Sequence, residues 1–160
     1  PHGQLGKVLS FQGRDDEAIA SYRKVIELSP AFSGVRHWLS IVLLGDGHDR
    51  AKAELALAAV ADEPSESYRL ETRAMACHAL GRKAESDAAL AELEATHATD
   101  SAWQIAVVHA FRGDDDAAFA WLDRAIENRD SGLTFALAEP YIRRLRSGPR
   151  WEEFLRKLRG

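Results

Sequence analysis

Four glycines, each between an apolar stretch and a polar helix start, constrain the fold of this chain most strongly. Gly13, Gly47, Gly81 and Gly113 are separated by 34, 34 and 32 residues. Glycine is favoured just after a helix ends, because it adopts the left-handed backbone conformation without steric cost. A helix–turn–helix pattern that recurs about every 34 residues predicts stacked helical repeats, in which no repeat can bury its apolar face alone.

The best-formed copy of the pattern is residues 13–30, GRDDEAIASYRKVIELSP. Ala18, Tyr22 and Val25 fall on one face of the predicted helix, and Pro30 ends it. The sequence is rich in Ala, Leu, Glu and Arg, which lose little side-chain entropy in a helix. Residues 13–30 are therefore expected to form the second helix of a hairpin.

Acidic clusters open two of the predicted helices, at residues 15–17 and 114–116. Adjacent carboxylates can ligate a divalent cation. Carboxylates at a helix start also cap free N–H groups and complement the helix dipole. Because both clusters closely follow a turn glycine, capping is the favoured interpretation.

Small residues recur where the two helices of each hairpin would cross. Close approach of two helices requires Gly, Ala or Ser at the crossing point. The predicted crossing residues are Gly6, Ser40, Ala74 and Ala106 on first helices, with Ala18 and Ala118 on second helices. Bulkier residues are expected to fill the space toward the next hairpin, namely Leu5, Tyr22, Leu39, Leu90 and Trp121.

These residues and their spacing resemble the tetratricopeptide repeat, with Leu5 and Gly6 before the turn and Ala18, Tyr22 and Pro30 after it. The resemblance implies an all-α, right-handed α-solenoid of about four helix–turn–helix repeats. The repeats would occupy residues 1–130, the first of them truncated, and residues 131–160 would form a helical cap. Lys52 stands where the family prefers a small residue, so the second helix of that repeat is expected to be shifted or short.

Two longer stretches, YRLETRAMACHALGRKAESDAALAEL from Tyr68 and LRSGPRWEEFLRKL from Leu145, resemble the C-terminal repeat region of bacterial multidomain regulators. In those proteins the repeats follow a winged-helix, nucleotide-cyclase or kinase domain. The resemblance implies a non-catalytic, cytoplasmic module of a larger bacterial protein. Its expected role is scaffolding or regulation, with a protein partner or another domain of the same chain.

The tetratricopeptide resemblance also implies a binding groove, because the first helix of each repeat lines the concave face. The expected lining is apolar and aromatic and suits a peptide or an amphipathic helix. The alternative is that some of these residues are ordinary inter-helix core. The candidates are Lys7, Phe11, His37, Ile41, Leu44, Tyr68, Glu71, Met75, His78, Trp103, Val107 and Phe111.

Charge is distributed unevenly along the chain. Residues 1–138 contain 14 Lys and Arg against 22 Asp and Glu, whereas residues 139–160 contain seven against three. The basic segment would either dock on the acidic body or bind an anionic partner such as nucleic acid. The acidic body disfavours nucleic acid. A further alternative function is homodimerisation through the apolar face or the N-terminal edge.

The sequence contains no arrangement of histidines, cysteines or glycines that is typical of a catalytic or metal site. None of the six histidines lies three or four residues from another, Cys77 is the single cysteine, and no glycine-rich phosphate loop occurs. The sequence predicts no enzyme, no metal site and no cofactor. No apolar run approaches the roughly 20 residues that span a bilayer.

Overall fold

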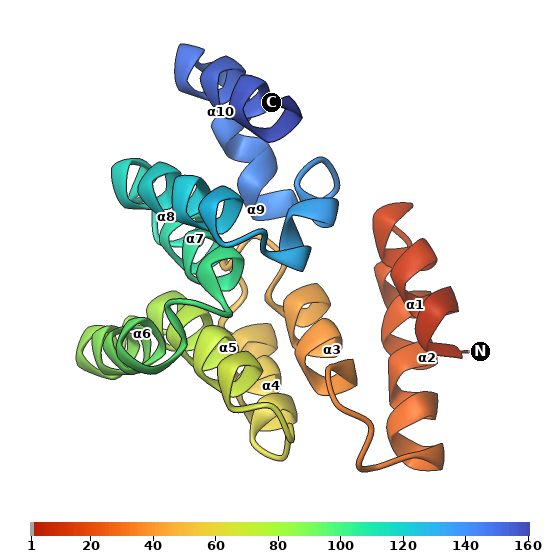
Figure 1. Cartoon of the computed structure of the whole chain (residues 1–160). Coiled ribbons are helices and arrows are strands. Elements are labelled where there is room, and N and C mark those ends of the chain that lie inside the picture. The colour runs from red at the N-terminus through yellow and green to blue at the C-terminus, as the bar shows by residue number, and fades with distance from the viewer. Residues whose placement is uncertain (1) are drawn as a thin grey trace. The chain divides into compact units, whose positions relative to one another are not determined.

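The computed structural model describes residues 2–160, and all regular structure in that range is helical (Figure 1). The first six α-helices are α1 (His2–Phe11), α2 (Asp15–Leu28), α3 (Val35–Leu44), α4 (Arg50–Val60), α5 (Glu66–Ala79) and α6 (Lys83–His97). They are followed by α7 (Ala102–Phe111), α8 (Asp115–Glu127), η1 (Ser131–Phe135), α9 (Pro140–Arg143), η2 (Arg144–Ser147) and α10 (Pro149–Arg159), where η denotes a 3-10 helix. The predicted all-α fold of successive helical hairpins is confirmed.

Contacts between residues divide the chain into two compact units. Unit 1 runs to Ala89 and unit 2 runs from Leu90 to Gly160. In unit 1 the first helices α1, α3 and α5 lie next to one another, while α2 packs on α1 and α3, and α4 packs on α3 and α5. Each of these second helices therefore covers the first helix of the following hairpin. The sequence-based boundary between residues 130 and 131 stays a prediction.

The turn glycines adopt the backbone conformation that their period implied. Gly13, Gly47, Gly81 and Gly113 have φ angles of 73°, 81°, 73° and 82°. After three of the first helices the closing hydrogen bond runs from the residue after the glycine to a carbonyl five residues earlier. The donor and acceptor pairs are Arg14 and Leu9, Arg82 and Cys77, and Asp114 and His109. This is the Schellman helix end, which satisfies carbonyls that the helix leaves free.

The second hairpin departs from this pattern. Helix α3 ends at Leu44, Gly45 also has a positive φ of 52°, and α4 begins only at Arg50 after an Asp49 cap. The small residue at the crossing moves by one position, so that Ala53 is buried and Lys52 is exposed. The expectation of a shifted second helix is confirmed.

The predicted small residues lie where the helices cross. A Cβ at Gly6 would stand 2.6 Å from Cε1 of Tyr22, so only glycine lets the buried tyrosine ring reach α1. Ala18, Ala74, Ala106 and Ala118 are fully buried, as is Ser40. The Ser40 hydroxyl donates to the carbonyl of Ala56 at 3.0 Å, which fastens α3 to α4.

One of the residues expected to fill the space between hairpins, Leu5, is wrongly predicted. Leu5 remains 48% exposed, because Gly6 and Leu9 are the buried residues of α1. Trp121 is only partly buried and lies under the Arg124 guanidinium, 4.1 Å from the ring centroid. Tyr22, Leu39 and Leu90 are buried as expected.

The acidic helix starts divide between two mechanisms. The side chain of Asp114 accepts a hydrogen bond from the Ala117 N–H at 3.2 Å, which confirms the capping prediction. At the other cluster the cap position belongs to Arg14, whose side chain makes no capping bond. Asp15, Asp16 and Glu17 stand instead inside the first turn of α2, where carboxylates favour the positive end of the helix dipole.

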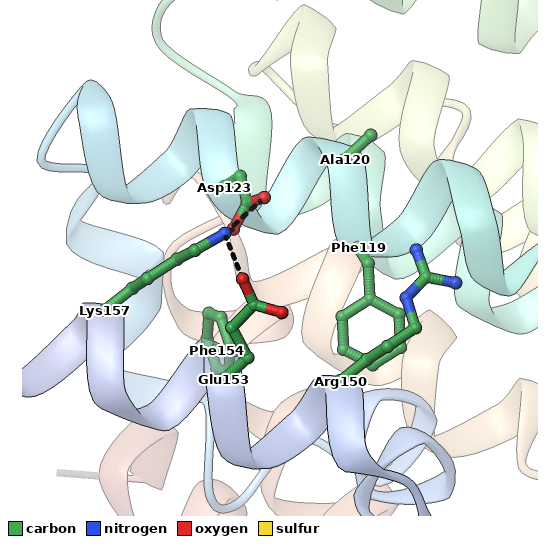
Figure 2. Close-up of a pocket in the computed structure, with 7 residues that line it drawn as sticks. All are labelled: Phe119, Ala120, Asp123, Arg150, Glu153, Phe154 and Lys157. Carbon is green, nitrogen blue, oxygen red and sulfur yellow. Dashed lines mark hydrogen bonds and ion pairs between the residues drawn. The ribbon is translucent and has the colours of Figure 1, made fainter.

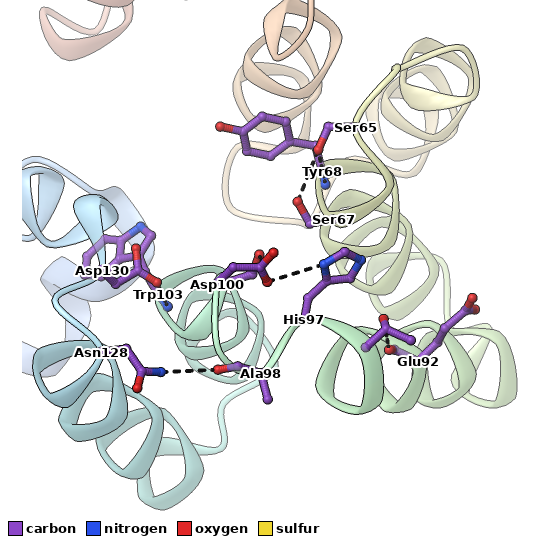
Figure 3. A network of polar contacts seen from close by, with 12 residues as sticks. Ser65, Ser67, Tyr68, Glu92, His97, Ala98, Asp100, Trp103, Asn128 and Asp130 are labelled. Carbon is purple, nitrogen blue, oxygen red and sulfur yellow. Dashed lines mark hydrogen bonds and ion pairs between the residues drawn. The ribbon is translucent and has the colours of Figure 1, made fainter.

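Two carboxylates from the loops after second helices hold the starts of first helices. In unit 1, Glu63 Oε1 accepts from the N–H groups of Gly34 at 2.8 Å and Ser65 at 3.2 Å. In unit 2, Asp130 Oδ2 accepts from the Trp103 N–H at 3.0 Å, an arrangement visible in Figure 3. Each hairpin involved is thus closed by a charge-assisted hydrogen bond.

In unit 2 the C-terminal helices dock on the last full hairpin, α9 on α7 and α10 on α8. Asp116 and Asp123 on α8 pair with Arg150 and Lys157 on α10, and each pair is 34 residues apart. The Arg144 side chain also donates to the Ala110 carbonyl across 34 residues. The period of the repeat therefore continues in the contacts beyond residue 130, where the glycine pattern of the sequence no longer follows it.

Candidate functional site: the aromatic surface of unit 1

Three adjacent first helices of unit 1 bring a cation and three aromatic rings to one surface. We call Lys7 and Phe11 of α1, Trp38 of α3 and Tyr68 of α5 the aromatic surface. The Lys7 Nζ lies 3.6 Å from the centroid of the Trp38 ring. Phe11 is 54% exposed, and the other three side chains are partly exposed. All four therefore remain accessible to a partner.

Gly34 lies beside two of these rings. Its φ is +93°, and a Cβ at this position would stand 3.4 Å from atoms of both Trp38 and Tyr68, an ordinary van der Waals contact. Any residue with a Cβ would nevertheless be strained at this backbone angle. The residue before α3 is therefore required to be glycine by its backbone conformation, and it lies within contact distance of rings from both α3 and α5.

The cation of the aromatic surface is held in an unusual environment. Partial burial lowers the pKa of Lys7 from its ordinary value of 10.5. The face of an indole ring is the strongest aromatic partner for an ammonium group, and it offsets part of the lost hydration. Trp38 therefore has two roles, presenting apolar area and keeping Lys7 in place.

A polar cluster beneath Tyr68 joins α3 to α5. The His37 ring stacks on Tyr68 with centroids 4.4 Å apart and an angle of 9° between the planes. His37 Nδ1 lies 2.9 Å from Thr72 Oγ1, and Nε2 lies 3.5 Å from Glu71 Oε2. Burial lowers the pKa of His37 to about 3. A neutral imidazole has one donor and one acceptor nitrogen, so the tautomer of His37 sets whether Nδ1 accepts from the Thr72 hydroxyl or donates to it.

The structure brings together only some of the residues that the sequence assigned to a groove. His37 contacts both Tyr68 and Glu71, while Lys7 contacts Trp38 and Phe11 lies one turn after Lys7. Two further residues of the set lie elsewhere on the same helices, Ile41 partly buried and His78 exposed. The remaining candidates are Leu44, Met75, Trp103 and Val107, all buried, and Phe111, which is partly buried.

Phe111 has its own neighbour in unit 2, where its ring meets the Tyr141 ring edge-on with centroids 5.0 Å apart. Tyr141 belongs to the segment expected to be a cap, which thus covers part of α7.

Sequence reasoning left Trp38 and Thr72 out of the candidate set. Both lie one residue after a candidate, His37 and Glu71, at equivalent positions of α3 and α5. For Trp38, the sequence did offer an indication: a large aromatic side chain next to a predicted groove often contributes to binding.

A hollow in unit 2 is a second candidate site. It measures about 270 Å³ between α8 and α10, with Phe119, Ala120 and Phe154 as its apolar lining (Figure 2). Lys157 Nζ lies 2.9 Å from Asp123 Oδ2, and the Arg150 guanidinium pairs with Asp116 and stacks 4.5 Å from the Phe119 centroid. Because both cations are already neutralised, the hollow is the seam between two docked helices.

The basic segment is thus turned toward its own body. Besides the two pairs of α10, Arg144 binds Asp115 at 2.6 Å. These pairs are exposed, and such pairs typically contribute about 1 kcal/mol or less. Three cations of the basic segment are therefore paired with carboxylates of the same chain, which leaves fewer positive charges for contacts with a phosphate backbone.

Other classes of site find no support in the part of the chain that the structure describes. Within residues 2–160, no group of three His, Cys, Asp or Glu side chains is placed to hold a metal ion. In the same range, no helix combines the length and apolar character that crossing a membrane requires.

Comparison with known proteins identifies the first hairpin. No curated protein and no solved structure matches the chain. Residues 2–32, which comprise α1 and α2, match the family model of the tetratricopeptide repeat. The chain therefore carries a tetratricopeptide repeat within an all-α fold of successive helical hairpins.

Proposed function

We propose that this chain is a non-catalytic protein-interaction module, and that the aromatic surface of unit 1 binds an apolar segment of a partner. The observation that carries the proposal is the convergence of Phe11, Trp38 and Tyr68 from three neighbouring helices, with all three rings accessible. Tetratricopeptide repeats generally mediate contacts between proteins, and such folds are typically not catalytic.

The rigidity and aromatic content of the surface favour a helix or an extended segment with apolar residues as its ligand. The rings are presented by stacked helices, so the surface is formed before binding and little ordering is required of it. Aromatic side chains at the centre of an interface often contribute most of its binding energy. Lys7 adds one positive charge, which favours a ligand with a carboxylate beside its apolar residues.

The wider setting belongs to the same proposal. The partner is a separate protein or another domain of the same chain, and the module works in the cytoplasm of a bacterium as part of a regulator. The single cysteine, Cys77, is buried and cannot form an internal disulfide, so a reducing compartment is allowed.

A random-peptide display selection tests the proposal, because it does not require the partner to be identified first. Enriched peptides are expected to share aromatic or long aliphatic residues, often with an acidic neighbour. Their affinity should fall at least tenfold for Phe11→Ser, which removes an exposed ring without opening a core cavity.

The matched control is Leu55→Ser on α4, where the side chain is 50% exposed away from the aromatic surface. If no peptide is enriched, or if enriched peptides bind the Phe11→Ser and wild-type chains equally, the proposed site is wrong.

A further inference from the structure

The last part of unit 2 has the layout of a further hairpin whose first helix is broken. The 34-residue spacing that pairs α8 with α10 places Pro140 in the register position of Ala106, a buried crossing residue of α7. Proline lacks the N–H that a helix interior requires, and it disfavours helical backbone at the residue before it. The helix is accordingly interrupted by a turn at residues 136–139, and α9 is only four residues long.

The broken helix docks less extensively than the first helices of unit 1. In unit 1, α3 packs on the preceding second helix α2, and α5 packs on α4. Helix α9 packs on α7, but within residues 2–160 it makes no extensive contact with α8. A hollow of about 270 Å³ also remains between α8 and α10 (Figure 2). Because protein interiors are normally close-packed, this seam is incompletely filled.

Two polar groups of this region are poorly accommodated in the docked state. Glu139 lies 34 residues after the fully buried Ile105, and burial raises the pKa of its carboxyl group to about 7. The Nε of Arg146 is buried, with no hydrogen-bond partner in the described part of the chain. Separation of the helices would return both groups to water, so their desolvation opposes docking.

Few contacts compensate for this cost. The buried apolar side chains of residues 140–159 are Ile142, Leu145, Trp151 and Phe154. In α7, by comparison, seven of ten residues are buried. The ion pairs between this segment and α8 leave more than two-fifths of each side chain exposed, and such pairs add little stability. A segment with few buried contacts is the kind that opens locally while the rest of a protein stays folded.

We propose that α9, η2 and α10, here called the C-terminal hairpin, open and close on α7 and α8 as one unit. The hinge is the turn at residues 136–139, since short turns that absorb backbone rotation commonly serve as hinges. The chain before the hinge stays attached, because Asp130 accepts from the Trp103 N–H and Gly132 lies against the Trp103 ring (Figure 3).

The closed C-terminal hairpin covers two aromatic side chains of unit 2. The Phe111 ring meets Tyr141 of α9, and the Phe119 ring lies under the Arg150 guanidinium of α10. Opening uncovers both rings together, so the hairpin is an autoinhibitory cap that controls access to them. This device lies in unit 2 and is additional to the proposed binding at the aromatic surface of unit 1.

Native-state hydrogen exchange of the whole 160-residue chain tests the proposal. Amides of α9 and α10 should be protected at least tenfold less than those of α7 and α8. Their opening should also show a single dependence on urea, because they open together. Exchange that accelerates only toward Gly160 is fraying of the last helix and overturns the proposal. Protection of α10 equal to that of α7 and α8 overturns it as well.

Thiol labelling gives a second readout with a matched control. Leu145 in η2 and Leu43 in α3 are both 4% exposed, and the native Cys77 is buried. The cysteine of Leu145→Cys should react at least tenfold faster than that of Leu43→Cys, because only the former is uncovered when the hinge opens. Equal labelling rates overturn the proposal. Neither measurement depends on the aromatic surface of unit 1, which the Phe11→Ser variant tests.

Discussion

At the scale of single residues, Arg129 is the position where sequence and backbone disagree. Its φ is +52°, and it is the one non-glycine residue with positive φ in the described part of the chain. The hydrogen bond from the Asp130 N–H to the Ala125 carbonyl, 2.9 Å long, repeats the helix end that glycine forms after α1, α5 and α7. A residue with a Cβ has replaced glycine here, at a steric cost.

We expect Arg129→Gly to stabilise unit 2 by about 1 kcal/mol, since the left-handed conformation costs a residue with a Cβ about 1–2 kcal/mol and glycine also loses more entropy on folding. The free energy of unfolding from urea titrations measures this effect. Arg129→Ala is the matched control, because it removes the same exposed side chain and keeps the Cβ. If the two variants are equally stable, a Cβ at position 129 causes no measurable backbone strain and the prediction is wrong.

At the scale of elements, Glu63 determines how two helices begin. Its Oε1 accepts from the Gly34 and Ser65 N–H groups, at the cap positions of α3 and α5, and from the Ser33 hydroxyl at 3.0 Å. The side chain is 1% exposed. The loop between α4 and α5 is thereby fastened to the loop between α2 and α3.

Glu63→Ala should lower the free energy of unfolding by about 2–4 kcal/mol, because it leaves buried N–H donors without an acceptor. Amide hydrogen exchange should accelerate most at the first turns of α3 and α5. Asp62→Ala, at the exposed neighbouring position, is expected to change stability by less than about 0.5 kcal/mol. A similar loss in both variants would mean that the capping bonds contribute nothing specific.

At the scale of the whole molecule, a buried histidine and a partly buried glutamate make stability depend on pH in opposite directions. The pKa of His37 in unit 1 falls from its ordinary 6.5 to about 3, because burial disfavours the imidazolium. The pKa of Glu139 in unit 2 rises from 4.5 to about 7, again chiefly through burial of the carboxylate, although the Tyr141 N–H and Arg143 oppose the rise.

The signs follow from proton binding. Between about pH 6.5 and 3 the unfolded chain binds a proton at His37 that the folded chain does not, so this contribution to stability is lost as the pH falls. Between about pH 4.5 and 7 the folded chain holds a proton at Glu139 that the unfolded chain has released, so this contribution is lost as the pH rises.

Denaturation across pH 4 to 8 should therefore show the two slopes separately in two variants, each up to about 1.4 kcal/mol per pH unit. His37→Gln should flatten the acid side of the profile, and Glu139→Gln should remove the decline between pH 4.5 and 7. His48→Gln, at an exposed histidine, should leave both slopes in place. If the free energy of unfolding of His37→Gln still falls as steeply toward acid pH, groups other than His37 cause that fall.

The helical hairpins, the positions of their turns and the small residues where their helices cross could all be predicted from the sequence. These features depend on local conformation and on fixed spacing: glycine at a left-handed turn, alanine where backbones approach, and apolar residues every three or four positions. The aromatic surface was half predicted, since Phe11 and Tyr68 follow from the helix register while Trp38 and its contact with Lys7 do not.

Which apolar residues stay exposed depends instead on the tertiary structure. Leu5 and Leu39 occupy the same position of their repeats, yet Leu39 is buried and Leu5 is 48% exposed. The same holds for the charges, because the pairing of Arg150 and Lys157 with α8 depends on how α10 docks. Burial depends on what lies against a side chain in space, and the periodicity of the chain specifies a helix face without specifying its neighbour.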